Sequence, residues 1–279
     1  VPENLNLIKV PVKARTRVKL YQKYTQWVAA ALANAETSTV VGFNKMPLLD
    51  VYFAADPCFA EKAETQRGFY YKLTSRYRHF YSYEKEIFGF RKSTQILYLS
   101  PQQRQAFEAY YPGCGDRLHE LPPGIAVDRK VESRDLDLRQ QFRQEFNVGD
   151  DDILLLQIGS GFKVKGVDRA LTAMASLPEA LLERTKFMLV GQDKSTAVDR
   201  LARRLGLADK LSILPGRDDI PRFLTGADLL IHPAYVESAG YVLLEATIAG
   251  LPVLTTASCG YSFHIEKAAS GEVCANPFQ

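Results

Sequence analysis

Residues 227–252 read Ala227-Asp-Leu-Leu-Ile-His-Pro-Ala234, Tyr235-Val236, Glu237-Ser-Ala-Gly-Tyr-Val-Leu-Leu-Glu245 and Ala246-Thr-Ile-Ala-Gly-Leu-Pro252. The Leu-Leu-Ile run before Pro233 is typical of a strand that is buried on both faces of a parallel sheet. The stretch after Gly240 has the composition of a helix that ends at Gly250 and Pro252. A strand, a loop and a helix in this order form one unit of an open α/β sheet, where ligands bind at the C-terminal ends of the strands.

Two carboxylates bracket the start of this expected helix. Glu237 falls in the loop after the strand, and Glu245 falls about one turn inside the helix. The backbone N–H groups near Ala239 and Gly240 form the helix N-terminus, which attracts anions. A sugar nucleotide needs charged acceptors for its hydroxyls and N–H donors for its diphosphate, so the pattern suits one. By spacing alone, two surface glutamates on a solvated helix explain it equally well.

Short apolar runs alternate with longer helical ones along the chain, which predicts parallel α/β sheets. We expect strands at residues 5–12, 39–43, 51–55, 95–99, 153–158, 186–190, 211–214, 229–232 and 253–255. We expect helices at residues 138–146, 171–177, 198–205 and 242–249. Pro122-Pro-Gly124 and the charged stretch after it predict a boundary between two Rossmann-like domains, residues 1–124 and 125–279.

The composition is that of an ordinary globular protein. The 279 residues are 46% apolar, and the formal charge of +3 is too small to argue for nucleic acid as a partner. The four cysteines (Cys58, Cys114, Cys259 and Cys274) are widely spaced, as expected of reduced thiols in a cytosolic protein. No apolar run approaches the roughly 18 residues that a membrane-spanning helix needs.

The pair Glu237 and Glu245 resembles the E-x7-E motif of the family-4 retaining glycosyltransferases, which have the GT-B fold. Other segments resemble the lipopolysaccharide core glucosyltransferase I proteins of that family, and the similarity covers essentially the whole chain. These segments are Gly42-Phe-Asn-Lys-Met-Pro47, Leu73-Thr-Ser-Arg-Tyr-Arg-His-Phe80, Leu121-Pro-Pro-Gly-Ile125, Gly166-Val-Asp-Arg169, Val190-Gly-Gln-Asp193, Leu254-Thr-Thr-Ala257 and Cys259-Gly-Tyr261.

The resemblance implies two Rossmann-like domains that face a cleft, with a UDP-sugar bound by the second domain and a lipid-linked sugar by the first. UDP-glucose is the implied donor and a heptose of the lipopolysaccharide inner core the implied acceptor. Neither a metal nor another cofactor is expected. In the family a strand and a Gly-rich loop precede the part that matches Leu5, and further helices follow, so we expect a chain truncated at both ends.

The loop Gly159-Ser-Gly-Phe-Lys-Val-Lys165 follows an expected strand, and glycines there allow close backbone approach to a diphosphate. In the family, an Arg-Lys pair contacts the β-phosphate of the donor. Lys165 matches the lysine, whereas the arginine position holds Val164. Either Lys163 supplies the second charge, or the site works with one cation.

The remaining site residues follow from the resemblance. Glu245 is expected to bind the ribose, and Glu237 to contact the transferred sugar, with Lys165 stabilising the leaving diphosphate. The loops of Gln192 and Arg217 are expected to receive the uracil and ribose. Asp56 ends a strand of the first domain, where it could orient hydroxyls or simply be a turn residue before Pro57.

Asn44 and Lys45 are expected on the acceptor side. His232 fits a structural histidine better than a site residue. Asp135-Leu-Asp137 could suggest a metal site, but carboxylates at the start of a helix explain it better.

The segment of residues 68–92 interleaves basic and aromatic side chains. Its exposed charges should include Arg76, Arg78 and Lys85, and this mixture suits the headgroup region of an anionic membrane. A helix with aromatics packed inward and charges in water is the alternative. Nucleic acid is a third reading, and no RNP-type motif supports it. We therefore expect a cytoplasmic enzyme, peripheral on the inner membrane face.

Three other functions stay open. A related GT-B enzyme could use another UDP-hexose or a UDP-N-acetylhexosamine. A nucleotide-sugar epimerase shares the architecture but acts on a soluble substrate, which leaves the basic-aromatic segment unexplained. A sugar-nucleotide-binding domain without turnover is the third, since Val164 replaces the arginine of the family.

Overall fold

The structure of the protein is a computed structural model that describes residues 4–36, 39–131 and 135–275. It divides into two compact units, residues 1–121 and 122–279, each of which is described by itself. The expected boundary at Gly124 lies in the irregular stretch just after the start of the second unit.

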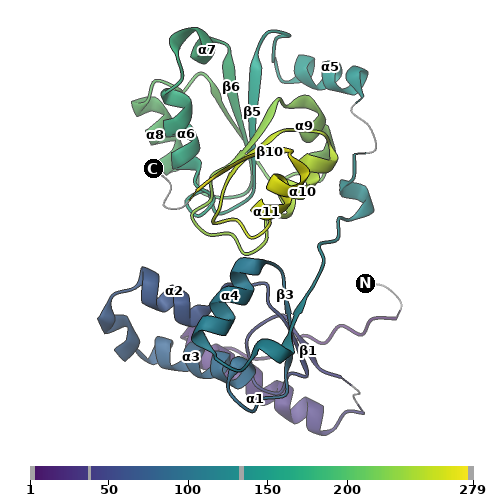
Figure 1. Ribbon diagram of the computed structural model, residues 1–279, viewed down its shortest axis with the longest axis vertical. Helices are drawn as coiled ribbons and strands as arrows, with labels where there is room; N and C mark the ends of the chain where they lie inside the picture. Colours follow the sequence, from purple (N-terminus) through teal and green to yellow (C-terminus); the bar gives the residue numbers. More distant parts are fainter. Residues whose placement is uncertain (1–3, 37–38, 132–134, 276–279) are drawn as a thin grey trace. The chain divides into compact units, whose positions relative to one another are not determined.

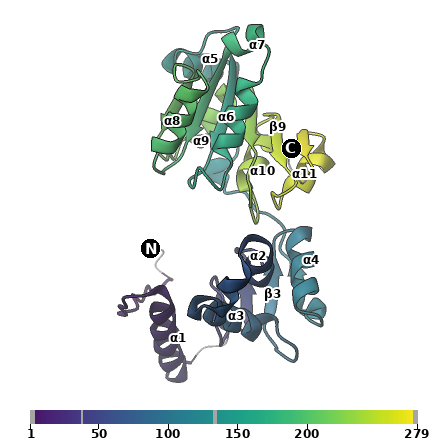
Figure 2. The same ribbon diagram turned by 90° about the vertical axis from the view of Figure 1, so that its left-hand side faces the viewer.

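The first unit is built on a parallel sheet with strand order β1-β2-β3-β4. Its strands are β1 (Val41–Gly42), β2 (Val51–Phe53), β3 (Gln95–Tyr98) and β4 (Leu118–Glu120). Its helices are α1 (Arg17–Ala33), α2 (Phe59–Gln66), α3 (Ser75–Phe88) and α4 (Pro101–Tyr110), with 3-10 turns η1 (Phe69–Leu73) and η2 (Gly115–Arg117). Figure 2 shows α3 between α1 and β3.

One expected strand of the first unit is wrong. Residues 5–12 have no regular structure and pair with no strand of the described residues, and Leu5, Leu7 and Ile8 are more than half exposed. Alternating apolar residues make a strand only where another strand supplies hydrogen bonds. Strand β4 was not expected from the sequence, because it has three residues of which only Leu118 is buried.

The core of the first unit joins its sheet to α3 and α4. The rings of Phe88 and Phe107 stack with their centroids 4.2 Å apart, and Tyr52 of β2 meets Phe88 edge-on at 5.9 Å. All three side chains are fully buried. This contact fixes both helices against the strand that ends near Asp56.

Beside this core, the carboxylate of Glu84 is fully buried and multiply hydrogen-bonded. It accepts from Lys45 Nζ at 2.6 Å, from the N–H groups of Phe59 at 2.7 Å and Ala60 at 2.8 Å, and from the hydroxyl of Tyr111 at 2.7 Å. Phe59 and Ala60 open α2, so Glu84 satisfies N–H groups that a helix start leaves unpaired. The side chain thus ties α2, α3 and the loop after β1 together.

The second unit has a six-stranded parallel sheet with order β10-β9-β8-β5-β6-β7. Its strands are β5 (Ile153–Ile158), β6 (Thr185–Val190), β7 (Leu211–Leu214), β8 (Leu229–His232), β9 (Val253–Thr256) and β10 (Gly271–Cys274). Its helices are α5 (Leu136–Glu145), α6 (Val167–Ala175), α7 (Glu179–Glu183), α8 (Thr196–Arg204), α9 (Ile220–Gly226), α10 (Tyr241–Ile248) and α11 (Ser262–Ala268), with the 3-10 turn η3 (Val127–Arg129).

Successive residues of β5 face opposite layers of helices. Leu154 and Leu156 belong to the core beneath α5, α9, α10 and α11, whereas Leu155 belongs to the core beneath α6 and α8. Figure 1 shows these two helical layers on either side of β5 and β6. Burial on both faces explains the continuous apolar run that predicted this strand.

Two aspartates have structural roles in this unit. Asp135 caps α5, since its Oδ1 accepts from the N–H groups of Asp137 and Leu138 at 2.9 and 3.1 Å. Asp228, at the start of β8, accepts from Leu154 N–H of β5 at 2.8 Å and from Arg143 at 3.0 Å. The first contact accounts for the Asp-x-Asp pattern, and the second fixes where β5 and β8 begin.

Glu84→Gln tests the buried carboxylate. We expect it to destabilise the first unit by about 3–5 kcal/mol, because it leaves Lys45 with an uncompensated buried charge. Glu86→Gln on the same helix is the matched control, because Glu86 pairs with Lys92 at the surface and should cost no more than about 1 kcal/mol. Denaturant unfolding followed by circular dichroism measures both, and equal losses would contradict this role of Glu84.

Candidate active site

Lys165 and Glu237 meet at the centre of the second sheet. Lys165 lies in the loop between β5 and α6, Glu237 lies in the loop between β8 and α10, and the Lys165 ammonium forms an ion pair with Glu237 Oε2. Both side chains are largely shielded from solvent, at 23% and 16% exposure. The chain leaves β5 toward β6 on one side and β8 toward β9 on the other. This is the switch point at which open α/β sheets bind ligands.

The two strands separate before they end. Only Leu155 pairs with Leu229 and Leu156 with Leu230, although β5 continues to Ile158 and β8 to His232. Backbone pairing therefore stops two residues short of both C-terminal ends. The β5–α6 loop is bonded to β5 in this region, because the buried Gln157 side chain donates to the carbonyl oxygen of Lys165 at 2.8 Å. The sheet itself supports the Lys165 loop.

The two loops are also joined directly through their backbones. Gly166 has φ +71°, and a Cβ there would lie 2.0 Å from the carbonyl oxygen of Pro233. The N–H of Tyr235 donates to the carbonyl of Val164 at 2.9 Å. Because L side chains rarely adopt this φ and no space remains, only glycine allows this approach. The approach sets the separation between Lys165 and Glu237.

The end of β5 also lies close to the end of β6. A Cβ on Gly191 would lie 2.4 Å from the carbonyl oxygen of Gly159, and Gly159 itself has φ +136°. The aliphatic part of the Lys165 side chain lies over Gly159, with Cε 3.5 Å from where its Cβ would be. The expected approach of Gly159 to a diphosphate stays a prediction.

The loop that carries Glu237 is anchored on its other side as well. Gly260 N–H donates to the Glu237 carbonyl at 2.9 Å, and Tyr261 N–H donates to the Ala239 carbonyl at 2.8 Å. Gly240 then caps α10 with φ +104°. Ala239 and Gly240 are buried at this helix start, where the sequence places them.

Glu245 lies in α10, as expected, and is half-buried. Burial raises the pKa of its carboxyl above the ordinary value of 4.5, and the nearby Arg129 opposes that rise. A carboxylate of this kind gains from hydroxyl donors that replace its lost hydration. Its surroundings suit the expected ribose contact, and the role itself stays a prediction.

The two lysines of the β5–α6 loop have different surroundings. Lys163 is exposed and lines a pocket of about 350 Å³ between α6 and α8, together with Asp168, Asp193 and Lys194. Lys165 alone pairs with Glu237. Val164 is half exposed. The geometry favours the alternative in which one cation serves the site.

The other two expected donor-binding side chains are those of Gln192 and Arg217. Gln192 is exposed, and its backbone N–H donates to Ser160 Oγ at 3.0 Å. Arg217 forms a two-pronged ion pair with Asp219, at 2.7 and 2.8 Å, and lies 5.1 Å from the Phe223 ring. That guanidinium lowers the pKa of Asp219 to about 2. Arg217 is therefore already paired within its own loop.

Several contacts of the site are not predicted by the sequence pattern. The Tyr235 hydroxyl donates to Asp168 at 2.7 Å, and the Arg169 guanidinium lies 3.7 Å from the centre of the Tyr235 ring. Arg169 also donates to the carbonyls of Pro233 and Ala234 at 3.3 Å. These contacts bind the start of α6 to the loop after β8. No local signal reveals them, because the partners are more than sixty positions apart in sequence.

His232 also belongs to the site, although the sequence favours a purely structural role for it. It ends β8, its side chain is fully buried, and its Nε2 is 3.6 Å from Glu237 Oε2. Neither ring nitrogen has a hydrogen-bond partner among the described residues. Burial and the charge of Lys165 lower its pKa to about 3, so the imidazole is neutral at physiological pH.

In the first unit, the expected acceptor residues share one pocket. A pocket of about 170 Å³ is lined by Tyr21, Asn44, Lys45, Asp56, Pro57, Phe59, Lys62 and Phe80. Asn44 and Asp56 are exposed at its edge. The Lys45 ammonium is bound to Glu84 and to the carbonyl of Pro57 at 2.7 Å, so it is less available than the sequence suggests.

The described residues contain no group of three or more His, Cys, Asp or Glu side chains that could hold a metal ion. Metal independence of the reaction stays a prediction, because this finding does not test the reaction. The site consists of paired charges and backbone N–H groups, which can bind a diphosphate and hydroxyl groups.

These features define an open α/β sheet with paired charges at its switch point, and comparison with known proteins specifies the class. The family of glycosyl transferases group 1 matches residues 139–279. The lipopolysaccharide glucosyltransferase WaaG of Escherichia coli K12 is 47% identical over 277 residues, which cover 99% of this chain and 74% of WaaG. The chain belongs to the group 1 glycosyltransferases.

Solved structures agree with this assignment. The crystal structure of WaaG, a glycosyltransferase involved in lipopolysaccharide biosynthesis, matches with a TM-score of 0.94 and 46% identity, over 100% of this chain and 75% of that one. Anabaena Alr3699/HepE, solved with UDP-glucose, matches with a TM-score of 0.69 at 19% identity, over 93% and 63% of the two chains, which supports the fold alone. The prediction of an α/β protein with the GT-B fold is confirmed.

A more distant relative matches about two thirds of this chain. The D-inositol 3-phosphate glycosyltransferase of Streptomyces scabiei is 26% identical over 192 residues, which cover 65% of this chain and 42% of that protein.

Glu245→Ala tests the nucleotide site. We expect it to weaken UDP binding by roughly 1.5–3 kcal/mol, the range for hydrogen bonds to a charged group. The pKa of Glu245 is raised above 4.5, and only the ionised carboxylate accepts hydrogen bonds from both ribose hydroxyls. UDP affinity should therefore fall as the pH is lowered through this pKa and the carboxyl takes up its proton. Calorimetry at several pH values measures both effects, and Glu245→Gln should remove this component of the pH dependence. An unchanged UDP affinity in Glu245→Ala would refute the ribose contact.

Proposed function

We propose that this protein is a retaining glucosyltransferase that moves glucose from UDP-glucose to a heptose of the lipopolysaccharide inner core. The donor binds the second domain and the acceptor the first. The observation that carries this proposal is the Lys165–Glu237 pair at the switch point of the second sheet, in a chain 47% identical to WaaG. The name of WaaG, a lipopolysaccharide glucosyltransferase, supports the choice of donor sugar and acceptor class.

Lys165 binds the β-phosphate of the donor in this proposal. Departure of UDP places new negative charge on that phosphate, and a fixed cation together with the N–H groups at the start of α10 stabilises it as it forms. Lys165 exchanges Glu237 for the phosphate when the donor binds. The Lys165 ammonium therefore has one anionic partner before and after the donor binds, and it is never left buried without a counter-charge.

Glu237, released from the lysine, accepts hydrogen bonds from hydroxyls of the transferred glucose, and Glu245 accepts those of the ribose. The acceptor oxygen forms a bond to the anomeric carbon on the face from which the phosphate oxygen leaves. The acceptor's proton passes to that departing phosphate. Because the new bond forms on the same face, the anomeric configuration is retained. No metal and no enzymic nucleophile takes part in this route, in contrast to the two-carboxylate retaining glycosidases.

The pocket of the first domain supports binding of a sugar acceptor. The rings of Tyr21, Phe59 and Phe80 line it, and Asn44 and Asp56 stand at its edge. Aromatic faces cover the apolar side of a sugar ring, while a carboxylate and an amide bind its hydroxyls. Asp56 orients the reacting hydroxyl in this arrangement.

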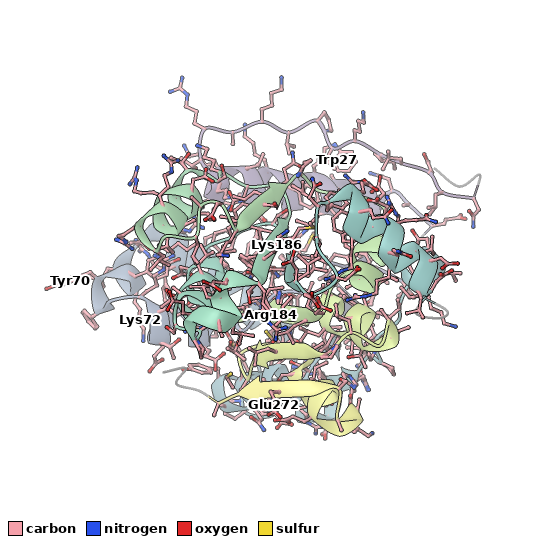
Figure 3. The ribbon with its side chains drawn as sticks, turned by 90° about the horizontal axis from the view of Figure 1, so that it is seen from above. Trp27, Tyr70, Lys72, Arg184, Lys186 and Glu272 are labelled. Carbon is pink, nitrogen blue, oxygen red and sulfur yellow. The ribbon has the colours of Figure 1, made fainter. Side chains whose placement is uncertain are left out.

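We also propose that residues 68–92 hold the enzyme against an anionic membrane. Arg76, Arg78 and Lys85 are exposed on α3, which supports contact with lipid phosphates. The aromatic residues of α3 are half-buried or buried. Exposed apolar side chains lie instead on η1, where Phe69, Tyr70 and Leu73 are 73%, 80% and 63% exposed, and just after α3, where Phe90 is 74% exposed. Figure 3 shows Tyr70 projecting outward.

This division assigns charge attraction to α3 and apolar insertion to η1. Within the described parts of the chain, no helix is long and apolar enough to cross a bilayer. We propose peripheral attachment through α3 and η1 at the cytoplasmic face of the inner membrane. The small net charge of the chain gives no support for nucleic acid as a partner.

Glu237→Gln tests the catalytic assignment. We expect kcat for glucose transfer to fall about 100-fold, the usual effect of losing one aligned polar contact in a transition state. UDP affinity should stay within about three-fold or improve, because Lys165 is no longer paired. Transfer of labelled glucose from UDP-glucose to lipopolysaccharide that lacks it measures kcat.

Glu272→Gln serves as the control, since Glu272 is exposed on β10 (Figure 3). Transfer at the wild-type rate by Glu237→Gln would refute the role of Glu237, and absence of lipid-linked product with the unaltered protein would refute the proposed reaction.

Replacing Arg76, Arg78 and Lys85 by Gln tests the membrane surface. Binding to vesicles that contain anionic lipid should weaken by about 1 kcal/mol for each residue, and the loss should shrink at high salt because of screening. The matched control replaces Arg200, Arg203 and Arg204, exposed on α8, by Gln. Replacing Phe69, Tyr70 and Leu73 by Ser should weaken binding at all salt concentrations. Equal binding of all three variants in vesicle flotation would contradict the proposal.

A further inference from the structure

His232 is a buried polar side chain for which the fold supplies no partner. Its side chain is fully buried, and Leu230 and Ile231 before it in β8 are buried apolar residues. Both ring nitrogens lack a hydrogen-bond partner among the described residues. Buried polar groups are nearly always hydrogen-bonded, because an unpaired one carries the full penalty of lost hydration. An apolar residue would serve the core better, so a structural role alone leaves this histidine unexplained.

The imidazole faces the group that this site uses. Nε2 lies 3.6 Å from Glu237 Oε2, which is the same oxygen that Lys165 contacts. This distance is slightly too long for a hydrogen bond, and a small movement of the carboxylate would close it. A neutral imidazole carries one N–H donor and one acceptor nitrogen, and the tautomer with the proton on Nε2 directs its donor at Glu237.

We propose that His232 is a positioning residue that holds Glu237 in its catalytic orientation once Lys165 has moved to the donor phosphate. In this inference, which rests on the proposed function, the Nε2–H of His232 donates to Glu237 Oε2 in place of the lysine. Glu237 keeps a partner through the exchange, and Lys165 is free to follow the diphosphate.

The neutrality of His232 matters for this role. Burial and the charge of Lys165 lower its pKa to about 3 while the lysine pairs with Glu237, and burial, the larger cause, persists when the lysine moves. The neutral imidazole can therefore orient the carboxylate without cancelling its negative charge. Glu237 then remains a full acceptor for sugar hydroxyls. A second lysine at this position would compete with those hydroxyls for the same carboxylate.

His232→Leu tests the proposal, with transfer kinetics, UDP affinity and thermal stability measured on the same protein. We expect kcat to fall about ten-fold, as for loss of one hydrogen bond to a charged group, while UDP affinity stays within about two-fold. The thermal midpoint should not fall, because the leucine removes an unpaired polar group. A lower midpoint together with equal losses in kcat and UDP affinity would indicate a merely structural residue and overturn the proposal.

His232→Gln provides the rescue, because its amide nitrogen can occupy the place of Nε2. It should recover most of the lost kcat, and failure to exceed His232→Leu would count against the inference. A double variant with Glu237→Gln separates this inference from the proposed function. If His232 acts through Glu237, the double variant is no slower than Glu237→Gln alone. Full activity of Glu237→Gln would refute the proposed function, whereas a slow Glu237→Gln beside a fully active His232→Leu would refute only the role of His232.

A measurement on the unaltered protein does not depend on how the variants fold. Nitrogen-15 NMR of the histidine rings should show the His232 proton on Nε2, and its signal should shift downfield when UDP is added, as a hydrogen bond to Glu237 forms. A proton on Nδ1, or a signal that UDP leaves unchanged, would overturn the proposal.

Discussion

The close backbone contact between Gly166 and Pro233 is the constraint on which the candidate site depends. Strands β5 and β8 are paired at their beginnings, where Asp228 joins them, and separate before their ends. Without a second contact the two loops would be free to move apart. The glycine allows the β5–α6 loop to rest on the end of β8, and the Lys165–Glu237 pair forms across that contact. A side chain at this position would displace one loop and separate the two charges.

The charges at this point are few, and each is shielded. A partly buried ion pair costs hydration, so it contributes little to stability, but it keeps two functional groups in fixed orientation. The same shielding makes His232 neutral and raises the pKa of Glu245. The site therefore holds carboxylates that gain from new hydrogen-bond donors and a lysine that already pairs with an anion, which suits the proposed binding of a sugar diphosphate.

In the first unit, the shielded carboxylate of Glu84 likewise joins several segments of the chain. One buried carboxylate accepts from the start of α2, pairs with Lys45 and accepts from Tyr111, so the helix that carries the basic surface residues is fixed to the loop that lines the pocket of the first unit. The same contacts occupy the ammonium group of Lys45. They also explain how α3 can expose Arg76, Arg78 and Lys85 on one side while its aromatic residues pack on the other.

The sequence by itself determined the alternation of strands and helices, the two-domain α/β class and the positions of Glu237 and Glu245 at the start of α10. These features are local: a buried parallel strand needs a continuous apolar run, and a loop between a strand and a helix is recognised from adjacent residues. The failed strand at residues 5–12 marks the limit of such patterns, because pairing needs a neighbour that no local pattern specifies. Only the tertiary structure decided which groups meet. Lys165 and Glu237 are 72 positions apart, and their contact, the place of His232 beneath it and the burial of Glu84 depend on strand order and on how closely two backbones approach.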